Sequence, residues 1–112
     1  MKGIALKPGD VVVGTLAGAV ETKIRPAVVI ASSGYLAERP DALLGILTTR
    51  PPARITSSDC VLLDWQSAGL RAESYFRAYV LTIHRSDLSV FGHPSDRDWD
   101  HVKACVRAAF AI

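Results

Sequence analysis

Basic residues gather in two short stretches of this sequence, and these are the places where the chain could bind an anion. Lys23 and Arg25 lie in the first stretch, while Arg50 and Arg54 lie in the second, which has no acidic residue from 42 to 58. They would form a local positive surface only if the fold brings the two stretches together. On the residues alone, solvated loop charge is the favoured interpretation, because the net charge is only +2 at pH 7.

Residues suited to a protein nucleophile or a metal site do not occur at diagnostic spacings. No Ser-His-Asp or Cys-His arrangement is readable from the sequence. The available metal ligands follow neither a C-x-x-C nor an H-E-x-x-H pattern; they are His84, His93, His101, Cys60 and Cys105. We therefore expect neither a metal nor a cofactor.

Three alternating carboxylates need a separate explanation. Asp96, Asp98 and Asp100 resemble part of a calcium-binding loop, but the glycine and the terminal glutamate of such a loop do not follow. Acidic residues stabilise the positive end of a helix dipole. We interpret these aspartates as the first turn of a helix.

Length and composition favour one soluble domain spanning 1–112. The chain has 49% hydrophobic and 21% charged residues, as in ordinary globular proteins, and 112 residues suit one core without disulfide or metal support. Two cysteines are too few for a disulfide framework, so we expect reduced thiols. No apolar run is long enough for a signal segment or a membrane span, and we expect a cytoplasmic protein.

The elements that must position these residues are mostly strands. Apolar and β-branched runs bounded by Gly, Pro or polar residues predict short strands over 11–16, 27–31, 42–48, 60–63, 75–83 and 88–91. We expect a loop over 17–24, a long connection over 32–41, and a helical turn over 64–70 that ends near Gly69. Pro26 limits the second strand, because proline is tolerated only at a strand's first position or on an edge.

The C-terminal segment changes from strand to helix periodicity. Apolar residues recur at helical spacing from Trp99 to Phe110, and Ser95 is the expected N-cap, with Asp98 three residues later as in a capping box. Short strands followed by one amphipathic helix predict a mainly β protein. The expected fold is a small, strongly curved antiparallel barrel with the C-terminal helix packed on it.

Several segments, in their order along the chain, together resemble the MazF/PemK toxin family. They are Pro-Gly-Asp-Val-Val at 8–12, Arg-Pro-Ala-Val-Val-Ile at 25–30, Ile-Leu-Thr-Thr at 46–49, Asp-Trp-Gln-Ser-Ala-Gly-Leu at 64–70, then Ser74 and the Phe-Gly pair at 91–92. Each is weak alone, but their spacing covers nearly the whole chain. The resemblance implies an SH3-like barrel of the PemK type.

The resemblance also implies a function. It implies the toxin of a type II toxin–antitoxin system, an endoribonuclease that cleaves single-stranded RNA without a metal by attack of the ribose 2′-hydroxyl. A homodimer would bind the RNA in a groove between subunits, and an antitoxin with a flexible acidic segment would occupy that groove. The alternative is a non-nuclease or catalytically inactive binding protein on the same barrel, such as a topoisomerase-targeting toxin.

Specific residues match the positions that the family uses. Arg25 is the candidate for stabilising the transition state, because a guanidinium stays charged and grips two phosphate oxygens. Thr48 is the candidate hydroxyl, which would contact a phosphate oxygen or orient the 2′-hydroxyl. Thr49 is the neighbouring choice, since strand alternation turns only one of the two toward the groove. Ser74 and Glu21 are additional candidates for catalysis or substrate binding.

The remaining basic residues would bind the RNA backbone. Lys23, Arg50 and Arg54 would contribute affinity and salt dependence but no sequence preference. The sequence departs from the family over 71–77, where Arg-Ala-Glu-Ser-Tyr-Phe-Arg replaces the usual Lys-Pro-Ser-Val-Val-Arg. Aromatic residues of this segment would stack on bases if exposed, although alternating aromatic residues in a strand are more often core.

Overall fold

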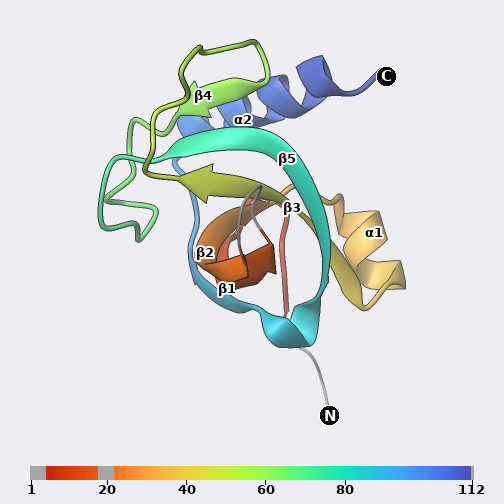
Figure 1. Cartoon of the computed structure of the whole chain (residues 1–112). Coiled ribbons are helices and arrows are strands. Elements are labelled where there is room, and N and C mark those ends of the chain that lie inside the picture. The colour runs from red at the N-terminus through yellow and green to blue at the C-terminus, as the bar shows by residue number, and fades with distance from the viewer. Residues whose placement is uncertain (1–4, 18–21, 112) are drawn as a thin grey trace.

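A single antiparallel sheet dominates the computed structural model, which describes residues 5–17 and 22–111. Its strands run in the order β4-β5-β3-β2-β1-β6. Their bounds are β1 Val11–Ala17, β2 Thr22–Val29, β3 Asp41–Thr48, β4 Asp59–Val61, β5 Tyr75–His84 and β6 Ser89–Gly92. Figure 1 shows the sheet curling around the molecule, with α1 (Ser33–Glu38) and α2 (Asp96–Ala109) near opposite ends of β3 and β5. The predicted mainly β, barrel-like class is confirmed, although the sheet stays open between β4 and β6 within the described residues.

Irregularities in strand pairing produce much of this curvature. β3 opposes β5 with Gly45 against Val80, but the next residue, Ile46, opposes Arg77, so β5 holds two extra residues at this point. Such bulges bend and twist a strand. Gly45 is needed at the bend, because a Cβ there would collide with the buried ring of Phe76.

The curled sheet buries apolar side chains on both of its faces. One cluster, which includes Val12, Leu16 and Leu44, lies between the inner strand faces and α1. The other, which includes Leu47 and Phe76, lies between the sheet and α2. Burial on both faces explains why β2 ends in a continuous apolar run instead of an alternating one.

Two of the sequence predictions about connections are wrong in part. The predicted loop over 17–24 ends early, because β2 already begins at Thr22 and pairs with β1 from Ala17↔Thr22 onward. Pro26 tolerates this position because β2 and β3 pair only from Ala27, which leaves that side of β2 open at the proline. The connection over 32–41 holds α1, whose N-cap Ser32 accepts the Tyr35 N–H at 3.1 Å.

The predicted N-cap of the C-terminal helix is confirmed. Ser95 has extended backbone angles, and its Oγ accepts the Asp98 N–H at 3.3 Å. Asp98 does not complete a capping box, because its carboxylate bonds to another segment. That segment is the turn before Leu70, where the carboxylate accepts the Leu63 and Asp64 N–H groups.

Both cysteines are free and buried within the cluster beneath α2. Burial raises the pKa of the Cys60 thiol well above its usual range, and burial likewise raises that of Cys105. Among the described residues, no helix is long and apolar enough to cross a membrane.

Candidate active site

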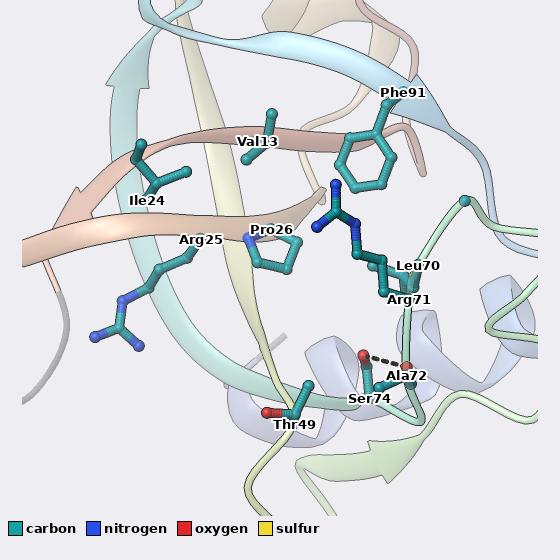
Figure 2. Close-up of a pocket in the computed structure, with 11 residues that line it drawn as sticks. Val13, Ile24, Arg25, Pro26, Thr49, Leu70, Arg71, Ala72, Ser74 and Phe91 are labelled. Atoms are coloured by element: carbon teal, nitrogen blue, oxygen red, sulfur yellow. Dashed lines mark hydrogen bonds between the residues drawn. The ribbon is translucent and has the colours of Figure 1, made fainter.

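A pocket of about 590 Å³ lies where the N-terminal half of β2, the segment after β3, the 69–74 segment and β6 meet. Figure 2 shows its lining residues, with Arg25 on one side, Arg71 and Phe91 on another, and Thr49 and Ser74 at the end of the pocket away from Phe91. The lining comprises Val13, Ile24, Arg25, Pro26, Thr49, Gly69, Leu70, Arg71, Ala72, Ser74 and Phe91. Two guanidinium groups, two hydroxyls and an apolar floor are thus brought together from five separate parts of the sequence.

Strand geometry places Arg25 and Thr48 on the same face of the sheet. Ala27 of β2 pairs with Ile46 of β3, and directly opposed residues project to one face. Arg25 lies two residues before Ala27 and Thr48 two residues after Ile46, so alternation returns both side chains to that face. The two residues singled out from the sequence therefore lie on neighbouring strands and face the same way.

The two adjacent threonines have different surroundings. Thr48 is half-buried at the end of β3, and its Oγ1 accepts the Arg50 N–H at 3.1 Å. Thr49 is exposed and lines the pocket with Arg25. The structure thus gives each threonine one of the two expected properties: the face of Arg25 for Thr48, and access to the pocket for Thr49.

Ser74 lines the same pocket but is almost fully buried, with 2% of its surface exposed. Its Oγ donates to the Ala72 carbonyl at 3.0 Å, and its own carbonyl accepts the Leu62 N–H at 2.9 Å. These bonds hold the segment before β5 against β4. The position of Ser74 fits a residue that shapes the pocket wall.

None of the predicted RNA-binding residues lines the pocket. Lys23 is exposed on β2, and Arg50 and Arg54 are exposed in the connection between β3 and β4. Arg50 directly follows the lining residue Thr49. Glu21, the additional acidic candidate, lies outside the described residues.

Sequence reasoning missed two lining residues, Arg71 and Phe91. Arg71 stands directly after the Asp-Trp-Gln-Ser-Ala-Gly-Leu segment, and Figure 2 shows its guanidinium reaching toward the Phe91 ring and Pro26. The basic residue at the end of a glycine-closed turn was a signal that could have identified Arg71. Phe91 carried no such signal, because its direction depends on an irregularity in strand pairing.

The turn before Arg71 has a defined shape. Gly69 has a φ of +88°, which L side chains rarely adopt, and the Leu70 N–H donates to the Trp65 carbonyl at 3.1 Å. The predicted helical turn closed by Gly69 is therefore confirmed. It directs the chain into the pocket at Leu70.

A buried carboxylate anchors this turn to the start of α2. Asp98 is 1% exposed, and its Oδ1 and Oδ2 accept the N–H groups of Leu63 and Asp64 at 2.9 and 2.8 Å. Two charge-assisted bonds to consecutive amides fix both position and direction. The helix thereby holds the segment that brings Arg71 to the pocket.

A second contact reinforces the same junction. Both guanidinium nitrogens Nε and Nη2 of Arg97 donate to the Asp64 carboxylate at 2.7 Å, and the Ser95 hydroxyl also donates to it. The hydrogen bonds from Arg97, followed by the bond from Ser95, lower the pKa of Asp64 to about 2. The aspartate that opens the family-like segment is therefore a structural residue.

No group of three or more His, Cys, Asp or Glu side chains within residues 5–17 and 22–111 is arranged to hold a metal ion. The polar groups that line the pocket are guanidinium and hydroxyl groups. Those groups bind and polarise anions. The chemistry suited to this lining is stabilisation of charge on a phosphate.

Comparison with solved structures identifies the fold. An endoribonuclease in complex with its cognate antitoxin, from a Mycobacterial species, superposes with a TM-score of 0.77 at 17% identity, covering 94% of each chain. MazF from Deinococcus radiodurans gives 0.74 at 16% identity, covering 97% of this chain and 99% of that one. The MazE–MazF complex of the same organism gives 0.70 at 13% identity, covering 97% and 98%.

These likenesses extend over nearly the full length of both chains, so this protein has the fold of MazF endoribonucleases. The fold implied by the sequence resemblance is confirmed. Comparison of the sequence with protein-family models and with curated proteins finds no match.

Proposed function

We propose that this protein is a MazF-like toxin, an endoribonuclease that cleaves single-stranded RNA in the cytoplasm and is restrained by an antitoxin. The observation that supports this most directly is the placement of Arg25 and Thr48 on one sheet face, beside a pocket lined by a further arginine and hydroxyl. The shared fold adds to it, because solved chains of that fold are endoribonucleases and two of them are bound to antitoxins.

The proposed reaction uses a nucleophile from the substrate. The ribose 2′-oxygen loses its proton and attacks the adjacent phosphorus, the bond from phosphorus to the 5′-oxygen breaks, and the departing 5′-oxygen takes up a proton. The products are a 2′,3′-cyclic phosphate and a 5′-hydroxyl, and atoms balance without a water, metal or cofactor. Such a mechanism requires only positioning and charge stabilisation from the protein.

Arg25 is proposed to stabilise the negative charge that develops on the phosphoryl oxygens. The always-charged guanidinium makes it suited to this role and poorly suited to that of a general base. Pro26 restricts the backbone directly after it, so the guanidinium is positioned from a stiff strand. Thr48 is proposed to supply the hydroxyl beside the scissile phosphate, with Thr49 contacting the substrate from the pocket side.

Cleavage of a varied single-stranded RNA pool in the presence of EDTA tests this proposal. Arg25→Ala should reduce cleavage by about a hundredfold or more, as expected for losing a main stabilising donor. Arg107→Ala is the matched control, because it removes an exposed arginine in the last turn of α2, outside the pocket lining. Cleavage that disappears with EDTA would contradict the metal-free mechanism, and unchanged cleavage by Arg25→Ala would contradict the catalytic assignment.

The two threonines are separated by a pair of isosteric variants. Thr48→Val should abolish most cleavage, whereas Thr49→Val should chiefly raise KM, since each removes one hydroxyl and keeps the side-chain shape. The reverse pattern would transfer the catalytic role to Thr49. No cleavage by the wild-type protein over many RNA sequences would favour a binding protein on the same barrel.

The homodimer and the antitoxin remain part of the proposal. A dimer at micromolar concentration in light scattering is expected, and a monomer of about 12.0 kDa would contradict a groove built from two subunits. An acidic segment suits the antitoxin because two arginines, Arg25 and Arg71, line the pocket. Co-purification of such a chain that suppresses cleavage would support this assignment.

A further inference from the structure

Phe91 is the exposed aromatic residue that lines the pocket, with 40% of its surface accessible. It lies on β6, an edge strand of the sheet. Ile24, which lines the same pocket, is also exposed, and exposed apolar side chains that share one site mark a binding surface. The placement of Phe91 has a specific structural origin.

A bulge turns Phe91 toward the pocket. Val12 of β1 opposes Val90, and Val11 opposes Gly92, so Phe91 is the extra residue on β6 at this register shift. In a regular strand, neighbouring residues point to opposite faces, and a bulge redirects the side chain at the insertion. The ring therefore faces the pocket because of a local break in the ladder.

Two glycines make room for this arrangement. Gly69 lies against the ring, since a Cβ there would come within 3.0 Å of Phe91 Cδ2. Gly92 lies against the Ala68 carbonyl, which a Cβ at position 92 would overlap. The turn that ends at Gly69 and the bulged strand are thus in direct contact, and the ring and Arg71 are held beside one another.

Arg71 completes the arrangement from the other element. It is exposed, it follows the anchored turn, and its guanidinium extends toward the Phe91 ring in Figure 2. Pro26 and Val13, which oppose each other across β1 and β2, supply an apolar floor between them. A flat apolar group attached to an anion would contact the Phe91 ring, the planar cation of Arg71 and the apolar floor.

We propose that Phe91 and Arg71 form a nucleobase slot that holds one base of the RNA next to the phosphate bound by Arg25, an inference that rests on the proposed function. Every base presents a π face to an aromatic ring, and a guanidinium adds cation–π attraction and pairs with the adjacent phosphate. The apolar floor excludes water from one side of the base. The slot therefore positions the substrate, and its contribution is to RNA affinity.

The occupant is an RNA base rather than a second copy of this chain because of the charges beside the ring. Arg25 and Arg71 line the same pocket, so an identical chain docking symmetrically here would bring like charges together. A polyanion that carries planar bases satisfies both the cations and the ring. The oligomeric state of the Phe91 variants therefore distinguishes an RNA base from a second copy of this chain.

The test is binding of a fluorescent, randomised 2′-O-methyl RNA 12-mer, which lacks the attacking hydroxyl and cannot be cleaved by the proposed reaction. Phe91→Leu should weaken binding by about fivefold or more, and Phe91→Tyr should restore it. Phe110→Leu is the matched control, because Phe110 is 44% exposed at the end of α2, away from the pocket. It should bind as the wild type does.

A second probe separates base stacking from backbone attraction. An abasic oligonucleotide of equal length keeps the phosphates, so Phe91→Leu should bind it as the wild type does, whereas Arg71→Gln should weaken both probes. Equal losses on both probes for Phe91→Leu, or a dimer that dissociates in that variant, would overturn the slot. If the wild type binds the 2′-O-methyl RNA but does not cleave ordinary RNA, the nuclease proposal alone is contradicted. If the wild type binds neither probe, the nuclease proposal and the nucleobase slot are both contradicted.

Discussion

Replacing Asp98 with asparagine should destabilise the protein, because Asp98 accepts two hydrogen bonds from the turn beside the candidate site. The carboxylate accepts the Leu63 and Asp64 N–H groups with different oxygens. Asparagine has one acceptor oxygen, so its amide nitrogen must face one of these donors. One N–H then loses its partner and the other loses a charged acceptor.

The magnitude follows from these two losses. An unsatisfied buried N–H costs about 1–3 kcal/mol, and loss of the charge on the second acceptor costs about 1 kcal/mol. We therefore expect Asp98→Asn to lower the free energy of unfolding by about 2–4 kcal/mol, which a domain stable by about 5–15 kcal/mol survives. Urea unfolding followed by the fluorescence of Trp65 and Trp99, both packed beside this junction, measures the loss.

Asp96→Asn is the matched control, since Asp96 is exposed and shares the first turn of α2. It removes a similar interaction with the helix dipole, worth about 0.3–1 kcal/mol, but no contact with the turn. If the two variants differ by less than about 0.5 kcal/mol, the paired hydrogen bonds do not anchor the turn and the reasoning fails. Hydrogen exchange gives a second measurement, because the amides of Leu63 and Asp64 should exchange faster only in Asp98→Asn.

Three further predictions concern the same region and the core beneath it. Hydrogen bonds from Arg97 lower the folded-state pKa of Asp64 from 3.8 to about 2, so the stabilisation that Asp64 provides should be complete above about pH 4 and disappear as the pH falls through about 2. The urea midpoints of wild type and Asp64→Asn should therefore converge near pH 2. A gap that stays constant with pH would contradict the ion pair. Gly92→Ala should cost about 1–3 kcal/mol in thermal unfolding, because its Cβ would overlap the Ala68 carbonyl, and an unchanged melting temperature would contradict this contact. The thiols of Cys60 and Cys105 should react with a disulfide reagent at pH 8 only in urea, because burial raises their pKa; fast reaction in the folded protein would contradict it.

Elements defined by local sequence were predictable. β-branched runs and prolines marked β1 and β3 to within one residue at either end, and Ser95 marked the start of α2. The short helix α1 was missed because its stability comes from distant residues. Its last carbonyls are bonded by Arg85, whose Nη2 donates to Leu36 and Arg39 at 2.5 and 2.6 Å.

The candidate site likewise combines residues that the local sequence identifies with residues that only distant contacts bring into place. Arg25 and Thr48 were identified from the sequence, but their shared face follows only from the register that pairs Ala27 with Ile46. Arg71 and Phe91 converge only through the turn closed by Gly69 and the bulge in β6, and neither feature has a local sequence pattern that fixes its partner. The threonine choice also required coordinates, since β3 ends at Thr48 and alternation stops there.

The anchoring of the pocket wall by the start of α2 has a consequence for protein synthesis. A nascent chain that has left the ribosome as far as Arg71 already has β2, β3 and both of its principal catalytic candidates, but not the carboxylate of Asp98 or the strand that brings Phe91. Because translation proceeds from the N-terminus at about 5–20 residues per second, the pocket wall is anchored only after Asp98 has been synthesised. For a protein proposed to cut RNA, the catalytic candidates are thus synthesised before the wall that completes their pocket.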